Sequence, residues 1–373
     1  MSVTIHPVET ARERKRFITL QWKFYEGDPY WVPPLLADRR KILDPRKNPF
    51  FRHGDMKLFI AEKDGVPSGR IAAITNENHN RIHEDTVGFF GFFESVEDGE
   101  VAAALFDAAR RWLRERGKTV MRGPMNPTVN DDVGLLVDGF DMPPVILMTY
   151  NPRYYPALLE GYGFRKAKDL YAYRITYDTV LTPKLERVQN IVRERYGITI
   201  RDVDFSRLAE ELVIVKELYN RSWEKNWGAV ALENEEIDAL AADLKPVLAK
   251  FQEFAFFCLK HGEPIGFAVT LPDINQILIT NRRGRLIPGA FKLLTQTKRI
   301  SQMRIILLGV LPEHRGLGFD SVMYYEIIRR AALRGIYTGE ASWVLEDNVM
   351  MNRAAKLLNA ERYKTYRLYD LDI

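Results

Sequence analysis

The residues best placed to do chemistry form a short glycine loop, residues 315–318 with the sequence RGLG. Before the loop, residues 303–311 are an apolar run that favours a buried strand, and Pro312 ends it. After the loop, residues 319–334 carry apolar side chains at helical spacing. A strand, a glycine loop and a helix together point unpaired backbone N–H groups at an anion. The pattern therefore predicts a phosphate-binding turn.

This stretch resembles motif A of the GNAT acyltransferase superfamily, Arg/Gln-x-x-Gly-x-Gly/Ala. Arg315 and Gly318 match the motif, whereas Asp320 stands where Gly or Ala is expected. The resemblance implies that the turn holds the pyrophosphate of acetyl-CoA or of a longer acyl-CoA, which would be the co-substrate. The cofactor-binding residues that it implies are Val310 and Leu311 beside the pantetheine arm, and Arg315, Gly316, Leu317, Gly318, Phe319 and Asp320 at the pyrophosphate.

Asp320 has two interpretations. A carboxylate about 5 Å from a phosphate charge would cost roughly 1–3 kcal/mol of binding free energy. If Asp320 caps the helix, it stabilises that helix by about 0.5–2 kcal/mol, and the capped helix would bind pyrophosphate poorly. If the helix has already begun, Asp320 lies near the azimuth of Ile327 and Ala331, faces the core and needs a partner.

The second motif of the superfamily is present in altered form. In the family an Asn opens the next helix, a Tyr seven residues later often protonates the leaving thiolate, and a Gly-Phe pair follows. By the resemblance, Asn348 fits the Asn and joins the cofactor-binding residues, while Ala355 takes the Tyr place. The resemblance therefore implies that the usual general acid is missing.

The chain of 373 residues is long enough for two domains. Each half shows the order hairpin, strand, helix, strand, helix, strand, with strands expected at residues 119–122 and 145–150 of the first half. We therefore predict an α/β (α+β) fold of two tandem GNAT-like domains, residues 1–177 and 178–373, each a mixed, mostly antiparallel twisted sheet flanked by helices. The layout is similar to that of the mycothiol synthases and the N-acyl amino acid synthases.

The first half lacks motif A. Glu97, Asp98 and Glu100 follow its aromatic strand, residues 86–94, and three carboxylates would repel a pyrophosphate. We therefore expect a CoA site only in the second half, with its motif at residues 310–320.

Composition narrows the function classes. Hydrophobic residues make up 46% of the chain and charged residues 28%, which is typical of a globular protein. The net charge of +4 is too small to predict nucleic-acid binding but suits an anionic ligand. Cys258 is the single cysteine, no apolar run approaches about 20 residues, and no apolar segment follows the basic residues near the N-terminus. These features predict a cytoplasmic protein without a signal peptide or membrane span.

Glu340 is the first candidate for a catalytic base. It lies on the strand after motif A, where the family often carries its base, and a carboxylate beside a buried cleft would have a raised pKa. The alternative is a strand glutamate that is exposed or ion-paired. Trp343, on the same strand, is a candidate substrate platform, although a tryptophan in a strand is more often part of the core.

The second candidate is the polar loop of residues 122–136, RGPMNPTVNDDVGLL. Long polar loops with several prolines and glycines are often functional, and carboxylates would suit an amine substrate. The alternative is a solvated turn in which Asn and Asp side chains bond their own backbone. From this loop we predict Asp132 and Asn130 as catalytic residues, and Asn126 and Asp131 as substrate-binding residues.

The third candidate is the segment of residues 282–299, which holds six basic residues and no acidic residue. It would cover a long acyl chain, attract an acidic acyl-carrier protein or a membrane surface, or form a solvated helix face, which is the commoner role of such a charge run. The histidines show no metal-ligand spacing, so no metal site is expected.

The resemblance to the GNAT superfamily implies an acyl-CoA-dependent N-acyltransferase that transfers an acetyl or longer acyl group to the amine of a small molecule. The amine would attack the thioester directly in a ternary complex, because no nucleophile for a covalent intermediate stands out. One alternative is a non-catalytic GNAT-fold protein with a binding or regulatory role. The other is an acyltransferase that takes a long acyl chain from an acyl-carrier protein.

Overall fold

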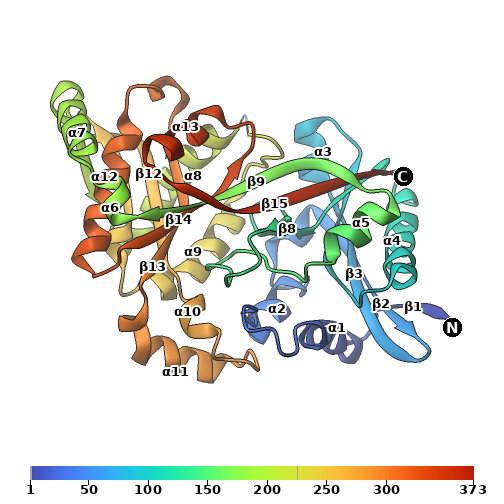
Figure 1. The fold of residues 1–373 in the computed structure, drawn as a ribbon. Coiled ribbons are helices and arrows are strands. Elements are labelled where there is room, and N and C mark those ends of the chain that lie inside the picture. Colours follow the sequence, from blue (N-terminus) through green and yellow to red (C-terminus); the bar gives the residue numbers. More distant parts are fainter. Residues whose placement is uncertain (1, 225) are drawn as a thin grey trace. The chain divides into compact units, whose positions relative to one another are not determined.

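The computed structural model describes residues 2–224 and 226–373 as a mixed α/β structure (Figure 1). Its contacts define two compact units. Unit 1 comprises Met1–Leu170, Leu278–Thr295 and Lys364–Ile373, and unit 2 comprises Tyr171–Ile277 and Gln296–Tyr363. These units interleave along the chain, whereas the predicted domains, residues 1–177 and 178–373, are continuous. The predicted domain boundary between residues 177 and 178 therefore stays a prediction.

Unit 1 is built on β1 (Val3–Pro7), β2 (Gly54–Lys63), β3 (Val66–Asn76), β4 (Val87–Ser95) and β5 (Val120–Gly123), in that order. The neighbours pair antiparallel except β4 and β5, which are parallel. The end of β15 (Glu361–Asp372) continues the sheet beside β5, and β8 (Leu135–Asp138) pairs with β15. β6 (Met125–Asn126) and β7 (Asp132–Val133) form a separate pair. The predicted strand at residues 145–150 is wrong, because this stretch is irregular and Leu147 has a φ of 58°.

Helices cover both faces of the unit 1 sheet. The helices with residues in this unit are α1 (Ala11–Phe24), α2 (Leu36–Ile42), η1 (Pro49–Arg52), α3 (Glu77–His83), α4 (Gly99–Arg114), α5 (Tyr155–Tyr162), α10 (Asn275–Leu278) and α11 (Leu286–Gln296). α4 begins where Asp98 caps its first turn, and it buries Leu105 and Phe106 against the sheet. On the other face, Phe17 of α1 packs edge-on against Phe92 of β4.

Unit 2 repeats this plan with β10 (Ile198–Asp202), β11 (Ala255–Lys260), β12 (Glu263–Pro272), β13 (Gln302–Val310), β14 (Thr338–Leu345) and part of β9 (Arg165–Thr176). β10 to β13 pair antiparallel, β13 and β14 are parallel, and β9 lies beside β14. In both units, therefore, the parallel pair follows an antiparallel hairpin and a third antiparallel strand.

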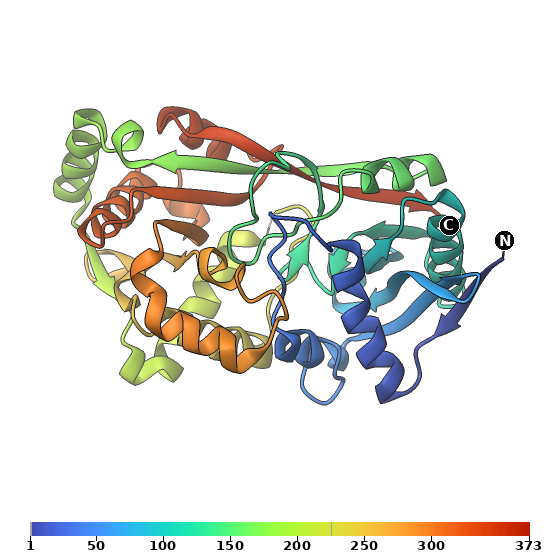
Figure 2. The same cartoon turned by 60° about the horizontal axis from the view of Figure 1, so that its bottom comes forward.

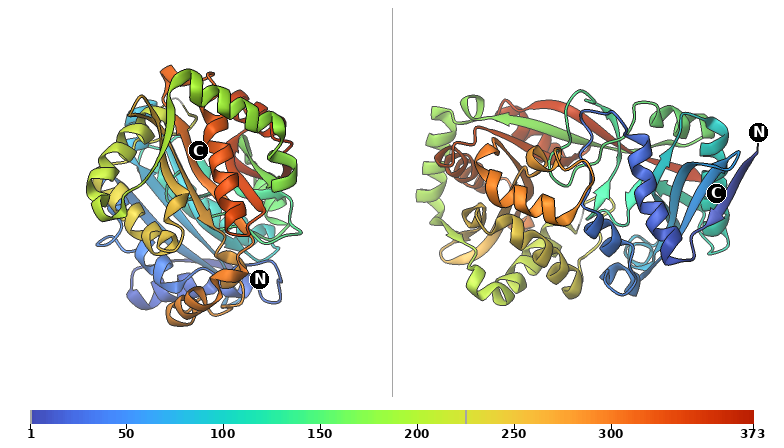
Figure 3. Two further views of the ribbon diagram at one scale, coloured as in Figure 1. Left: turned by 90° about the vertical axis from the view of Figure 1, so that its left-hand side faces the viewer. Right: turned by 90° about the horizontal axis from the view of Figure 1, so that it is seen from below.

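The helices of unit 2 are α6 (Tyr177–Val180), α7 (Pro183–Tyr196), η2 (Phe205–Arg207), α8 (Leu208–Trp223), α9 (Asn234–Leu248), η3 (Gln252–Phe254), η4 (Thr297–Arg299), η5 (Pro312–His314), α12 (Phe319–Leu333) and α13 (Val349–Leu357). α7 and α12 lie side by side on one face of the sheet (Figures 1 and 3). On the other face, Trp223 of α8 packs against Phe267 of β12. Neighbouring residues of β12 therefore face opposite layers, as a strand buried on both faces requires.

Candidate functional site

The predicted phosphate turn lies in unit 2, between β13 and α12. Gly316 has a φ of 75° and Gly318 a φ of 83°, a left-handed conformation that residues with a side chain rarely adopt. A Cβ atom added at Gly316 would meet nothing within 4 Å, so the backbone conformation, not crowding, requires glycine there. The loop therefore has the tight, exposed geometry that the motif predicts.

The N-cap position of α12 carries no capping side chain. Gly318 is the N-cap residue and supplies no side-chain hydrogen bond. Asp320 is half-buried in the first helical turn, so the interpretation of Asp320 as the N-cap residue is wrong and the helix has already begun at Phe319. Burial raises the pKa of the Asp320 carboxyl, and hydrogen bonds from the N–H groups of Ser321 and of Asp320 itself offset only part of that rise.

Arg315 is fixed at the rim of this turn. Its Nε donates to the carbonyl oxygen of Val310 at 3.2 Å, and its guanidinium also donates to the carbonyl oxygen of Ser222, at the end of α8. Both acceptors are neutral, and the side chain is exposed. A positive charge therefore stands beside the uncapped helix start, which favours an anion there.

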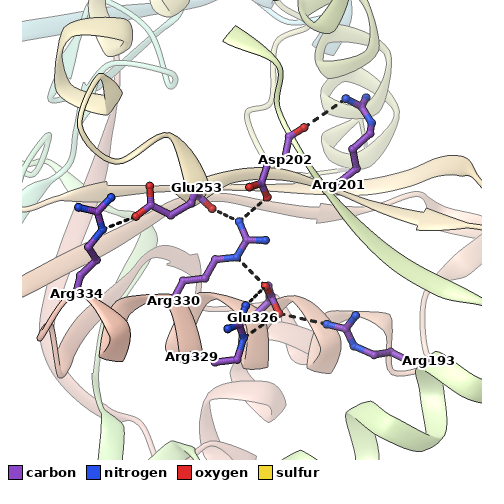
Figure 4. A network of polar contacts seen from close by, with 8 residues as sticks. All are labelled: Arg193, Arg201, Asp202, Glu253, Glu326, Arg329, Arg330 and Arg334. Atoms are coloured by element: carbon purple, nitrogen blue, oxygen red, sulfur yellow. Dashed lines mark hydrogen bonds and ion pairs between the residues drawn. The ribbon is translucent and has the colours of Figure 1, made fainter.

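A network of charged side chains holds α12 in place (Figure 4). Glu326 accepts from Arg329 and Arg330 of its own helix at 2.7 Å and lies 3.3 Å from Arg193 of α7. Arg330 continues the network to Asp202 of β10 at 2.6 Å. Burial alone would raise the pKa of Glu326, but the hydrogen bonds from the arginines outweigh it and lower that pKa. The helix that carries the turn is thus tied to both the neighbouring helix and the sheet.

β13 and β14 separate beside the turn. Their pairing runs from Gln302 opposite Thr338 to Ile305 opposite Ala341, while β13 continues to Val310 and β14 to Leu345. A bulge on the other edge leaves Ile306 without a register partner on β12. Residues 305–308 of this central strand are only half-buried. Beyond Ile305 the backbone of β13 is therefore not paired with β14.

Glu340 lies in the last paired part of the two strands. Its side chain is fully buried, one carboxylate oxygen accepts from Ser342 Oγ and the other from the hydroxyl of Tyr363. Arg304 lies 4.0 Å away and donates to Ser342 Oγ at 2.9 Å. Glu340 is therefore an ion-paired, hydrogen-bonded carboxylate that reaches its surroundings through Tyr363, which is half-buried.

Trp343 and Asn348 follow on the same side of unit 2. Trp343 is half-buried, and its indole Nε1 is buried without a hydrogen-bond partner in the part of the chain described. A buried donor in this state is rare and marks a place where an acceptor is missing. Asn348, predicted to bind the cofactor, is the N-cap of α13, and its side chain accepts from the N–H of Met351 at 3.1 Å.

The four predicted residues of the polar loop lie in unit 1. Asn126 enters the space beside β4 after β4 and β5 stop pairing at Phe89 opposite Arg122, and its side-chain oxygen accepts from the N–H of Phe92 at 2.6 Å. Phe92 lies at a bulge in the β3–β4 pairing and has a φ of 49°. The backbone N–H at the bulge, that of Phe92, is therefore already hydrogen-bonded to the side chain of Asn126.

The other three residues of the loop bond within unit 1. Asp131 accepts from the N–H and hydroxyl of Thr128 at 3.2 and 2.7 Å, and the N–H of Asn130 donates to Thr128 Oγ1 at 3.1 Å. Asp132 is paired with Arg39 at 2.7 Å. All three side chains are half-buried. The loop thus has a defined shape, built largely from its own polar groups.

Three residues that the sequence alone did not identify stand out. Tyr363 contacts Glu340, Arg304 completes its ion pair, and Ile306 marks the bulge.

Among residues 2–224 and 226–373, no group of His, Cys, Asp or Glu is arranged to hold a metal ion. The same residues include no helix that is long and apolar enough to cross a membrane.

No protein-family model matches the chain. The bacterial ceramide synthase of Caulobacter vibrioides (strain NA1000 / CB15N) is 35% identical over 376 residues, which cover 99% of this chain and 97% of that protein. Protein YghO of Escherichia coli (strain K12) is 34% identical over 367 residues, covering 96% and 93%. A solved tandem GNAT protein from the clavulanic acid biosynthesis pathway superposes with a TM-score of 0.57 at 13% identity, over 100% of this chain and 98% of that chain. The predicted tandem fold is thereby confirmed.

Proposed function

Because the chain belongs to the family of the bacterial ceramide synthase and protein YghO, within the GNAT acyltransferase superfamily, we propose that it is an acyl-CoA-dependent N-acyltransferase. The acyl donor binds in unit 2, and the acceptor is the amine of a small molecule. The name of the ceramide synthase suggests the class of product, an amide of a long-chain amino alcohol.

One observation carries this proposal: unit 2 combines a stretch of β13 that is not paired with β14 and an uncapped glycine turn. The amides at the start of α12 and the Arg315 guanidinium fit a pyrophosphate. The edge of β13 beyond Ile305 fits the amide groups of a pantetheine arm, because backbone pairing there has ended. The half-buried residues 306–308 fit an acyl chain.

The reaction needs few groups from the protein. The amine nitrogen attacks the thioester carbon, a C–N bond forms, and the C–S bond breaks to release the thiol. The N–H of Ile306 donates to the carbonyl oxygen as negative charge develops. The amine gives up its proton to the Tyr363–Glu340 pair, with Glu340 as the base and the Tyr363 hydroxyl as its contact with the amine. The released thiolate takes up that proton, so the protonation balance closes.

Asn126, Asn130, Asp131 and Asp132 keep their predicted place on the acceptor side only as a proposal. Asp132 would attract an ammonium group if it exchanged its partner Arg39 for the substrate. Asn130 and Asp131 would act through the shape of the loop, because they bond Thr128. Trp343 offers its indole N–H to a substrate oxygen.

The direct test is turnover with defined substrates. Purified protein is mixed with acyl-CoAs of increasing chain length and a long-chain amino alcohol, free thiol is followed by a colour reagent, and the amide is identified by mass spectrometry. Equal amounts of thiol and amide are expected, and a Tyr363→Phe variant should lose most of the rate. Turnover with acyl-carrier protein but not with any acyl-CoA would replace the donor in this proposal. No amide with either donor would overturn it.

A further inference from the structure

Residues 282–295 of the basic segment predicted from sequence belong to unit 1, and residues 296–299 belong to unit 2. Residues 278–295 of unit 1 run from the end of α10 through most of α11, the orange helices in Figures 1 and 2. The indole N–H of Trp22 donates to the carbonyl oxygen of Arg282 at 2.8 Å. The Arg282 guanidinium donates in turn to the carbonyl oxygens of Asp28 at 2.6 Å and Trp31 at 2.8 Å. These bonds attach the segment to the end of α1 and the loop after it.

The inner side of α11 packs closely. Gly289 is buried, and a Cβ atom added there would lie 3.1 Å from Leu35 Cδ2 and 3.0 Å from Asn281 Nδ2. Lys292 points back along the segment, where its Nζ donates to the hydroxyl of Thr280 at 2.7 Å. One side of α11 therefore packs against other residues of unit 1.

The outer side of α11 is apolar. Its exposed side chains, with their exposed fractions, are Leu286 (52%), Ile287 (82%), Phe291 (67%) and Leu294 (66%). At about 100° per residue they cover a stripe roughly 140° wide. A solvated helix face, the commoner role of a charge run, would instead carry its charges on this stripe. An exposed apolar stripe of this kind marks an interaction surface.

Basic residues stand beside this stripe. Arg283 and Arg285 are exposed immediately before α11, and residues 282–299 include no acidic residue. We propose that the outer face of α11, defined by Leu286, Ile287, Phe291 and Leu294 with Arg283 and Arg285, docks on an anionic lipid surface. The apolar stripe enters the boundary between headgroups and acyl chains, and the two arginines contact lipid phosphates.

The apolar stripe distinguishes a lipid surface from an acidic protein. An acidic acyl-carrier protein would be attracted by the same arginines, but attraction by charge does not require large apolar side chains that point outward over about two helical turns. A helix with one apolar face and basic residues immediately before it resembles the helices that lie in a membrane interface. This inference is independent of the proposed reaction, because lipid binding is measured without substrate.

Vesicle co-sedimentation tests the proposal with the full chain. Vesicles of phosphatidylcholine containing about 30% phosphatidylglycerol should bind the protein, and pure phosphatidylcholine should bind it much more weakly. The double variant Ile287→Ser, Phe291→Ser should lower the partition coefficient at least about tenfold, since each side chain loses its apolar burial. Arg283→Gln with Arg285→Gln should weaken binding and reduce its dependence on salt.

Matched control variants test whether the loss of any exposed apolar or basic side chains weakens vesicle binding. Leu333→Ser with Leu357→Ser removes two apolar side chains that are 75% and 72% exposed in unit 2, and Arg12→Gln with Arg187→Gln removes two exposed charges elsewhere. These controls should bind vesicles like the unaltered protein, and all variants should keep their melting temperature. Absence of vesicle binding, equal loss in the controls, or binding to an acidic acyl-carrier protein but not to vesicles would overturn the proposal.

Discussion

The gap between β4 and β5 in unit 1 and the gap between β13 and β14 in unit 2 are built alike but differ in their surroundings. Each gap opens after a short parallel pairing, and each lies beside a bulge in the preceding antiparallel pair. In unit 1, every residue of β4 is buried and Asn126 bonds the amide of Phe92 at the bulge. In unit 2, residues 305–308 of β13 are half-buried. The loop of unit 1 thus bonds the strand beside its gap, whereas the corresponding strand of unit 2 is less buried.

The difference extends to the helix that follows each strand. α4 of unit 1 is capped by Asp98, whose carboxylate accepts from the N–H groups of Glu100 and Val101, whereas α12 of unit 2 begins at Gly318 without a side-chain cap. A carboxylate at the first position occupies the amides that an incoming phosphate would need. The N-cap position therefore carries a carboxylate in unit 1 and a glycine in unit 2, where the Asp320 carboxyl accepts instead from the N–H groups of Asp320 and Ser321.

The largest expected effect comes from removing the open turn of unit 2. In Gly316→Val a residue with a side chain would have to adopt a left-handed backbone conformation, which costs about 1–2 kcal/mol and would distort the amides that face the phosphate. We expect donor affinity to fall by about 100-fold, measured by titration calorimetry with CoA. Gly335→Val is the matched control, because Gly335 has a φ of 73° at the other end of α12 and equally open surroundings. If both variants lost affinity equally, the turn would not be the donor site.

Removing the Asn126 side chain, which bonds the strand beside the gap in unit 1, should affect stability rather than donor binding. Asn126→Ala leaves the N–H of Phe92 without its acceptor, which costs about 1–3 kcal/mol of unfolding free energy. Chemical denaturation measures the loss, and the CoA dissociation constant should stay within about twofold. A stable variant with weakened CoA binding would instead assign the donor site to unit 1.

Asp320 should oppose the donor in a manner that depends on pH. Because burial raises its pKa, the carboxyl takes up a proton more readily in the folded chain, and the protonated form no longer repels a phosphate. CoA binding should therefore strengthen as pH falls through this pKa. Asp320→Asn should bind CoA about tenfold more tightly above that pKa and show a flatter pH profile.

The same residue has a consequence for stability. A carboxyl with a raised folded-state pKa binds its proton more tightly in the folded than in the unfolded chain, so its contribution to stability is lost as pH rises. Melting temperatures of Asp320→Asn should consequently exceed those of the unaltered protein at neutral pH and converge with them in acid. A variant with unchanged affinity and an unchanged profile would show that Asp320 does not face the donor.

The smallest expected effect concerns the unpaired indole. Trp343→Phe removes a buried N–H that lacks a partner and keeps an aromatic ring over Arg304, so the free protein should not be destabilised. If a substrate oxygen accepts from this N–H, substrate affinity should fall by about twofold to tenfold. Steady-state KM values for donor and acceptor identify which substrate is involved, and unchanged values for both would remove Trp343 from the site.

Local patterns predicted the turn and its flanking elements well. Pro312, the glycines and the apolar run of residues 303–311 are neighbours in sequence, and the structure gives β13, the loop and α12 at these positions. The resemblance to GNAT motif A, together with the repeated order of elements, implied the tandem GNAT fold, and the solved tandem GNAT protein confirms the fold. The strand predicted at residues 145–150 failed because an apolar run does not by itself distinguish a strand from an irregular buried segment.

Local sequence patterns could not predict contacts between residues that are far apart in the sequence. Tyr363 meets Glu340 across 23 residues, and Asn126 meets Phe92 across 34. The charge of residues 282–299 was visible in the sequence, but the outward orientation of its apolar residues depends on how Gly289 packs. Side-chain partners of this kind follow from tertiary packing, which overrides local preference.

Hydrogen–deuterium exchange with and without CoA tests the central contrast most directly. The account predicts slower exchange at residues 306–320 of unit 2, where the backbone amides of β13 and of the start of α12 gain acceptors. Exchange at residues 87–95 and 124–134 of unit 1 should stay unchanged, because the loop of unit 1 already bonds the strand beside its gap. Protection of the unit 1 segments, with none at residues 306–320, would contradict the account.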